Sequence, residues 1–192
     1  MDDHKDWYSR KLPHLDIGGL TQFLTFNLFD SLPQEVLSQW REELKDFKGN
    51  IDREREERIQ AYLDRGFGSC ILREDQCAQI VRDSLLFLDG DAYDLRAWVI
   101  MPNHVHFLAH FNQGQSLGKA MWSLKSFTAH KLKKIHPELE FIWHQESYDR
   151  YIRNEEHYGN TVRYINQNPV NARLCKDPSS YRWCDLFGHT EE

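Results

Sequence analysis

Hydrophobic and polar residues alternate along several short parts of the chain, and such alternation is typical of half-buried β-strands. The alternating stretches are 20–29, 93–101 and 104–111. Only Pro102 and Asn103 separate the last two, so we expect those strands to form a hairpin. A later segment, 141–152, is rich in aromatic residues and is predicted to be a short strand or extended piece.

Elsewhere the apolar residues recur every three or four positions, which predicts helices. The predicted helical ranges are 34–64 with a break near 49–50, then 74–88, 115–136 and 155–168. We expect Ser31 to cap the first of these helices, with Pro33 near its first turn. We expect the last helix to end at Asn168, because a residue before proline disfavours the helical conformation.

Two of these helices have an apolar face that we expect to pack inward. In the helix over 74–88 the face consists of Cys77, Ile80, Val81, Leu85 and Leu88. In the helix over 115–136 the lysines are expected to face outward and the inward residues to be Leu117, Met121, Leu124, Phe127 and Leu132. We also expect Trp122, Trp143 and Trp183 in the core; the alternative is that they stack on unpaired bases.

The order of elements is strand, helix, strand, strand, helix, strand, helix. This order is typical of an α+β protein with a ferredoxin-like antiparallel sheet and its helices on one face. We expect a single domain over 1–192, in which the highly charged region at about 32–66 is a solvated helical insertion after the first strand. Residues 9–19 are expected to form an irregular arm, and residues 181–186 to pack back on the body.

Composition excludes several classes of protein. The chain has no run of about 18 apolar residues, so we expect no membrane-spanning helix. Its first residues are acidic and polar, which is not the pattern of a secretory signal. The four cysteines lack metal-type spacing and are interpreted as reduced thiols. Together these features predict a cytoplasmic protein.

The formal net charge of −6 argues mildly against binding to nucleic acid, but the charges are unevenly distributed. Two segments, 115–135 and 157–176, contain no acidic residue. Their basic residues are Lys119, Lys125, Lys131, Lys133, Lys134, Arg163, Arg173 and Lys176. Such segments can bind phosphates locally, and the alternative is that the lysines form only a solvated face.

A His-Val-His sequence begins the strand over 104–111. Side chains alternate along a strand, so His104 and His106 face the same side, with their Cα atoms roughly 7 Å apart. Two neighbouring imidazoles on a rigid strand can share one metal ion, although packed or surface histidines would give the same pattern. His110 continues the alternation and is expected at the strand end, and His144 is expected to be structural.

The last predicted helix carries Tyr164 and Asn168 four residues apart, and therefore on one face, with Arg163 beside them. A phenol is a poor nucleophile at neutral pH, because its ordinary pKa is about 10. A divalent ion bound to a phosphate makes the phosphorus more electrophilic, so that a tyrosine oxygen can attack it. The rival tyrosines, expected to lie in the core, are Tyr148, Tyr151 and Tyr158.

With these motifs the chain resembles the REP-associated tyrosine transposases, within the HUH single-strand transposases. The most specific part is Met-Pro-Asn-His-Val-His, followed later by Tyr-Ile-x-x-Asn-Pro-Val. The resembling segments, in order, are 12–14, 23–26, 30–33, 98–106, 124–128, 143–153 and 164–170. One departure is Arg173, where the family motif often has glycine, and this places the turn after the helix in question.

The resemblance implies a function. His104 and His106 would bind Mg²⁺ or Mn²⁺, with Asn168 as a third ligand, and Tyr164 would attack a DNA phosphate to leave a 5′-phosphotyrosine and a free 3′-OH. The substrate would be single-stranded DNA with a palindromic hairpin of the REP type. The protein would act in the cytoplasm at the nucleoid, as a monomer rather than a dimer.

Two other functions stay open at this point. One is a regulator that binds hairpin DNA without cutting it, and the other is a metal-dependent hydrolase that uses activated water. For each DNA-binding function we expect phosphate contacts from the acid-free segments, at Lys119, Lys125, Lys131 and Arg163.

Overall fold

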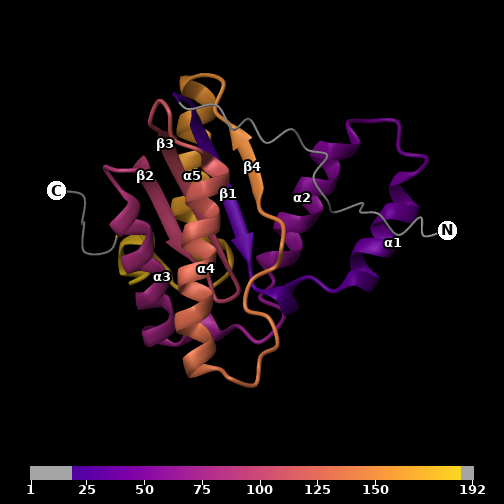
Figure 1. Ribbon diagram of the computed structural model, residues 1–192. Helices are drawn as coiled ribbons and strands as arrows, with labels where there is room; N and C mark the ends of the chain where they lie inside the picture. Colours follow the sequence, from indigo (N-terminus) through magenta and orange to yellow (C-terminus); the bar gives the residue numbers. More distant parts are fainter. Residues whose placement is uncertain (1–18, 187–192) are drawn as a thin grey trace.

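The computed structural model describes residues 19–186, in which a four-stranded sheet is combined with five α-helices (Figure 1). The strands are β1 (Thr21–Asn27), β2 (Tyr93–Ile100), β3 (His104–Phe111) and β4 (Tyr148–Tyr151). Their order across the sheet is β2-β3-β1-β4, and every neighbouring pair is antiparallel. The expected hairpin of β2 and β3 is confirmed, because Ile100 pairs with Val105 and the Met101 N–H donates to the His104 carbonyl at 2.8 Å.

The helices are α1 (Gln34–Leu44), α2 (Ile51–Leu63), α3 (Asp75–Leu88), α4 (Leu117–Ile135) and α5 (Glu155–Asn171). The expected break in the first helical region is confirmed, and the Asn50 side chain caps α2 by accepting from the Arg53 N–H at 3.0 Å. The expectation that Ser31 caps α1 is wrong. Ser31 belongs to a short 3-10 turn and donates its hydroxyl to the Leu28 carbonyl, while Pro33 occupies the cap position.

The expectation that α5 ends at Asn168 is wrong. The helix continues through Pro169 to Asn171. A proline in the last turn removes only its own hydrogen bond, and the next ones survive. The Ala172 N–H donates to the Asn168 carbonyl at 2.9 Å, and the Leu174 N–H donates to the Pro169 carbonyl at 2.8 Å. Burial of Asn168 and Pro169 therefore outweighs the local preference of the residue before proline.

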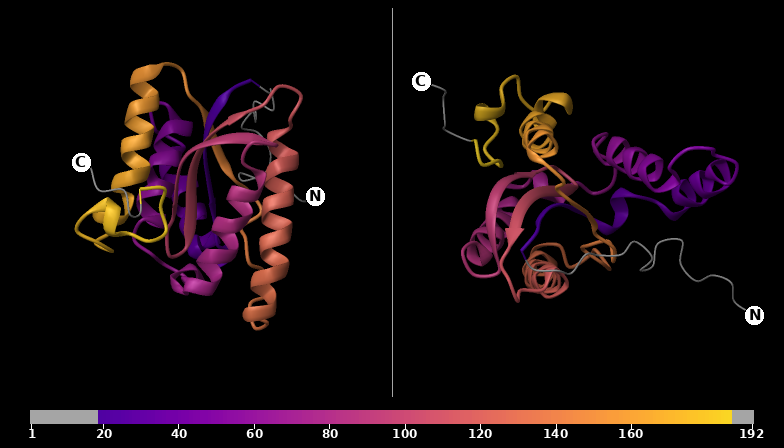
Figure 2. Two further views of the ribbon diagram at one scale, coloured as in Figure 1. Left: turned by 90° about the vertical axis from the view of Figure 1, so that its left-hand side faces the viewer. Right: turned by 90° about the horizontal axis from the view of Figure 1, so that it is seen from above.

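Helices cover both faces of the sheet, so the prediction of helices on one face is wrong (Figure 2, right). On one face α3 and α4 pack over residues of β3 that include Val105 and Phe107. On the other face α5 packs over Leu108 and its neighbour Val99 of β2. The two central strands are buried on both sides, which requires a cover on each.

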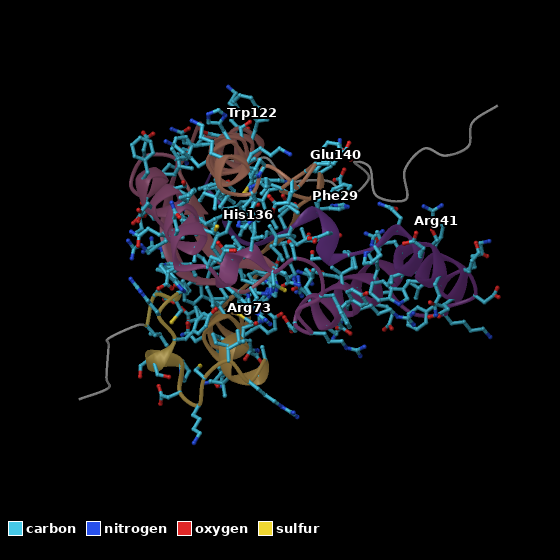
Figure 3. The ribbon with its side chains drawn as sticks, turned by 90° about the horizontal axis from the view of Figure 1, so that it is seen from below. Phe29, Arg41, Arg73, Trp122, His136 and Glu140 are labelled. Carbon is cyan, nitrogen blue, oxygen red and sulfur yellow. The ribbon has the colours of Figure 1, made fainter. Side chains whose placement is uncertain are left out.

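The inward face of α4 also differs from the prediction. Phe127 is 54% exposed, and Thr128 takes its place inside, where its hydroxyl accepts from the Trp143 indole N–H at 2.9 Å. Trp122 is 73% exposed and lies on the outer side of α4 (Figure 3), whereas Trp143 and Trp183 are buried as expected. In α3, the inward face is confirmed: Cys77, Val81 and Leu85 are buried, with Ile80 and Leu88 partly buried.

The C-terminal segment packs on the free edge of β2, as expected. The Ile100 N–H donates to the Trp183 carbonyl at 2.8 Å, and the Asp185 N–H donates to the Trp98 carbonyl at 3.2 Å. The expected arm over 9–19 lies, except for Gly19, outside the described residues. No helix between residues 19 and 186 is long and apolar enough to cross a membrane.

Helices α1 and α2 lie beyond β4, at the side of the sheet (Figure 1). Their outer faces are charged, as predicted, and several ion pairs join residues three or four apart. Their inner faces form a small core of their own, made of Leu32, Leu37, Ile59, Leu63 and Tyr148. This packing fixes the last turn of α2 against the face of the sheet that carries the two histidines.

Candidate active site

The two histidines of β3 lie on the α5 side of the sheet and are fully buried. The Nε2 atoms of His104 and His106 are 3.0 Å apart, and their rings meet edge to face. The alternation that predicted a shared face is thus confirmed in the structure. The rings are held at this distance because β3 is a central strand, paired on both sides.

Hydrogen bonds to the Nδ1 atom of each ring hold the two imidazoles in place. The Asn103 amide donates to the Phe67 carbonyl at 2.9 Å, so its oxygen is free to accept from His104 Nδ1–H at 2.7 Å. Thr25 Oγ1 lies 2.8 Å from His106 Nδ1 and also accepts from the Gln60 amide at 3.1 Å. When Nδ1 carries the proton on both rings, the two Nε2 atoms present lone pairs to one another.

Asp64, directly after α2, adds a third acceptor beside the Nε2 atoms of the two histidines. Its Oδ1 lies 3.5 Å from His104 Nε2, and the ligand atoms of Asp64, His104 and His106 all lie within 4.8 Å of one another. Burial and the neighbouring His104 hold the pKa of His106 well below its usual range, which keeps the ring in its neutral, ligating form. Three converging lone pairs repel unless a cation lies between them, and nitrogen and oxygen donors of this kind suit a divalent ion.

Tyr164 of α5 reaches the same point. Its hydroxyl oxygen lies 3.5 Å from His106 Nε2 and donates to the Gln60 side-chain oxygen at 3.4 Å. The Phe23 ring meets the tyrosine ring edge to face, which fixes its orientation. Burial raises the pKa of the Tyr164 phenol well above its usual range, and the Asp64 carboxylate raises it further. The side chain is therefore a neutral phenol at physiological pH.

Asn168 lies one turn after Tyr164 and is also buried. Its amide donates to Asp64 Oδ1 at 3.2 Å. Its own Oδ1 is buried and has no hydrogen-bond partner within residues 19–186. A buried amide oxygen without a partner is unfavourable, and it is available to a ligand. The structure thus brings Asn168 to the cluster formed by Asp64, His104 and His106.

The other predicted DNA contacts lie elsewhere. Lys119 and Lys131 are exposed on α4, across the sheet from Tyr164. Arg163 is exposed on α5 and donates to Asn160 at 3.1 Å. The expectation that the α4 lysines face outward is wrong for Lys125. Its ammonium group donates to the carbonyls of residues 144 and 145 at 2.7 and 2.8 Å, and burial lowers its pKa to about 8.

The remaining histidines and tyrosines are distributed as follows. His144 is buried, as expected, and its burial lowers its pKa to about 4. Tyr148 lies in the core beside α1 and α2, but Tyr151 and Tyr158 are each 37% exposed rather than buried. His110 is partly buried near the end of β3, where its Nδ1 lies 3.1 Å from Thr21 Oγ1.

A cleft of about 840 Å³ opens between α2 and the β4–α5 segment. Its basic residues are Arg53, Arg55, Arg150 and Arg153. Its acidic residues are Asp52, Glu56, Asp149 and Glu156, and Glu56 pairs with Arg150 at 3.2 Å.

Sequence reasoning did not identify Thr25, Gln60 or Asp64. Gln60 and Asp64 are four residues apart at the end of α2, the same spacing as Tyr164 and Asn168 on α5. That spacing was the only signal in the sequence, and it was hidden in a helix whose other residues are mostly charged and exposed.

Comparison with known proteins places this geometry in context. Residues 74–168 match the family described as IS200-like transposases. This range contains His104, His106, Tyr164 and Asn168, but not Gln60 or Asp64.

A curated relative, the REP-associated tyrosine transposase of Escherichia coli (strain K12), is 27% identical over 105 residues. The matched part is 54% of this chain and 61% of that protein, so the chain spans about three fifths of the relative's length. A solved structure of a REP-associated tyrosine transposase bound to a REP hairpin has a TM-score of 0.60 at 21% identity. The superposed part covers 93% of this chain and 81% of the solved chain. The two structures share their fold.

Proposed function

The chain belongs to the IS200-like transposase family, and we propose that it is a metal-dependent single-stranded DNA endonuclease and strand transferase. Its substrate would be palindromic hairpin DNA of the REP type. The names of the curated relative and of the structural neighbour support this substrate class. The observation that carries the proposal is the position of the Tyr164 hydroxyl, 3.5 Å from His106 Nε2 in the same chain.

The fold is consistent with the proposal at a finer level. The strand order and the antiparallel pairing are those of a ferredoxin-like sheet, which we assign to the HUH type. On this assignment residues 1–192 form one domain, with the helical insertion at about 32–66. Because Tyr164 reaches the histidine pair of its own chain, one copy contains a complete site, and we propose a monomer.

The proposed reaction is a transfer of the phosphoryl group to tyrosine. Tyr164 Oη attacks the phosphorus, the bond from phosphorus to the 3′ oxygen breaks, and the phenolic proton is transferred to that oxygen. The products are a 5′-phosphotyrosine and a free 3′-OH. His104 and His106, with Asn168, would hold Mg²⁺ or Mn²⁺, which neutralises charge on the phosphate when bound.

The residues of the chain prepare this step. Gln60 accepts the hydrogen bond from the Tyr164 hydroxyl and so orients it. Phe23 and the buried strand limit access of water to the phenol. The cleft between α2 and the β4–α5 segment would offer Arg153, and Arg150 on exchange of its Glu56 partner, to the phosphates of a single strand. Arg163, Lys119 and Lys131 are available to the rest of the hairpin. For Lys125, which binds backbone carbonyls, we propose that it shapes the loop before β4.

The proposal is tested by trapping the covalent product. Labelled hairpin DNA is incubated with the protein and Mn²⁺, and adducts are separated under denaturing conditions. We expect wild type to form an adduct and Tyr164→Phe to form none. Tyr158→Phe, on the same helix and partly exposed, is the matched control and should retain adduct formation. An adduct in Tyr164→Phe would show that another residue is the nucleophile.

A second function is favoured by the raised pKa of Tyr164, which makes the phenol unreactive without help. The protein would then bind hairpin DNA as a regulator and not cut it. Binding that survives EDTA, with no cleavage of any hairpin tested, would support this alternative and contradict the proposal.

A further inference from the structure

We infer that the helical insertion supplies a ligand to the ion site, the carboxylate of Asp64, and that Asn168 orients this carboxylate from α5. The inference rests on the proposed function, because it concerns the same ion. It revises that function in one respect: the third protein ligand is Asp64, from outside the segment that matches the family, and Asn168 becomes its hydrogen-bond partner. It also gives the insertion a role in the chemistry.

The insertion and the tyrosine helix meet through two matched pairs of side chains. Gln60 and Asp64 are four residues apart on α2 and directly after it, and Tyr164 and Asn168 are four apart on α5. Gln60 accepts from the Tyr164 hydroxyl at 3.4 Å, and Asp64 accepts from the Asn168 amide at 3.2 Å. Residues equally spaced on two helices can form such pairs only when the helices lie in a fixed register.

Asp64 faces the pair of imidazole rings. Its Oδ1 lies 3.5 Å from His104 Nε2, and the other ring nitrogen of His104 is hydrogen-bonded to the Asn103 side-chain oxygen. Within the described part of the chain, no lysine or arginine forms a salt bridge with Asp64. A carboxylate facing two imidazole lone pairs is repelled unless a cation joins them.

Asn168 has the position of an outer partner in this arrangement. Ligating carboxylates are commonly held by a hydrogen bond from a second residue, and the loss of that bond weakens metal binding. The Asn168 amide provides such a bond to Oδ1. Two neutral imidazoles and one carboxylate form a donor set that suits Mn²⁺ and related divalent ions. The carboxylate also supplies the negative charge that the two neutral rings lack.

The test measures binding of Mn²⁺ alone to the full chain, without DNA. Free Mn²⁺ is followed by its electron paramagnetic resonance signal during titration of wild type, Asp64→Asn and Asp46→Asn. Asp46 is exposed in the loop between α1 and α2, so its variant is the matched control for loss of one negative charge. We expect Asp64→Asn to bind Mn²⁺ at least about tenfold more weakly, and Asp46→Asn to bind as wild type does.

The outcomes are distinct. Equal Mn²⁺ affinity in wild type and Asp64→Asn overturns the inference and leaves the proposed function intact. A wild type that binds no Mn²⁺ overturns both. A second variant, Asp64→Cys, keeps the inference testable if Asp64→Asn does not fold, as judged by circular dichroism. A thiolate at the ion should give an ultraviolet charge-transfer band with Cd²⁺ that wild type lacks, and a folded variant without this band contradicts the inference.

Discussion

Replacement of Thr25 by valine removes one hydroxyl that serves two buried partners. Thr25 Oγ1 is hydrogen-bonded to His106 Nδ1 at 2.8 Å and accepts from the Gln60 amide at 3.1 Å. Valine has nearly the same shape, so the change leaves the packing of β1 intact and affects only the hydrogen bonds. Two buried polar groups, His106 Nδ1 and the Gln60 amide, then lose their hydrogen-bond partner.

The expected loss of stability follows from these contacts. A buried donor or acceptor without a partner costs about 1–3 kcal/mol, so two such groups predict that Thr25→Val loses at least about 2 kcal/mol of unfolding free energy. Loss of an outer partner of a metal-binding histidine typically weakens metal affinity about 10–100-fold. We therefore expect a lower midpoint in urea, measured without metal, and a higher dissociation constant for Mn²⁺.

The chain offers a matched control on the same pair of strands. Thr21 faces His110 across β1 and β3 in the same way that Thr25 faces His106, and its Oγ1 lies 3.1 Å from His110 Nδ1. That pair is only partly buried, so water can replace the lost hydroxyl. Thr21→Val should lose less than about 1 kcal/mol and bind Mn²⁺ normally. The reasoning would be refuted if Thr25→Val bound Mn²⁺ as tightly as wild type does. It would also be refuted if Thr25→Val and Thr21→Val lost the same unfolding free energy.

Two further predictions concern stability. Arg173 has a φ of 58°, in the left-handed region, so Arg173→Gly should stabilise the protein by about 0.5–1 kcal/mol in urea unfolding, while Ala172→Gly, at a φ of −78°, should destabilise it. Burial lowers the pKa of His144 to about 4 in the folded protein. Between pH 6.5 and pH 4 the unfolded state therefore binds one more proton than the folded state. Up to about 3 kcal/mol of unfolding free energy is lost as the pH falls through this window. His144→Gln should flatten this pH dependence and the exposed His130→Asn should not; an unchanged slope in His144→Gln would contradict the assignment.

The sequence predicted most of the elements because their signals are local. Alternation predicted β1, β2 and β3, and the helical period predicted α3 and α4 within a few residues. The shared face of His104 and His106 follows from the strand period alone, and that of Tyr164 and Asn168 from the helix period. Whether those two faces meet is a matter of packing, which local patterns do not determine.

The errors have a common physical cause, which is that tertiary contacts override local preferences. Helix α5 continues past Asn168 because Asn168 and Pro169 are both buried. Thr128 replaces Phe127 inside α4 because Trp143 needs a hydrogen-bond acceptor there. Asp64 was missed because its partners His104 and Asn168 are far from it in sequence, and a charged residue at a helix end usually faces solvent.

The pairing of the C-terminal segment with β2 has a consequence for self-association. Exposed strand edges recruit other strands and promote aggregation. One border of this sheet has its free backbone groups occupied by Trp183 and Asp185, and the opposite border is the four-residue β4, which carries Asp149 and Arg150. Neither border is a good template for another copy, so the protein can accumulate in a cell without polymerising through its sheet.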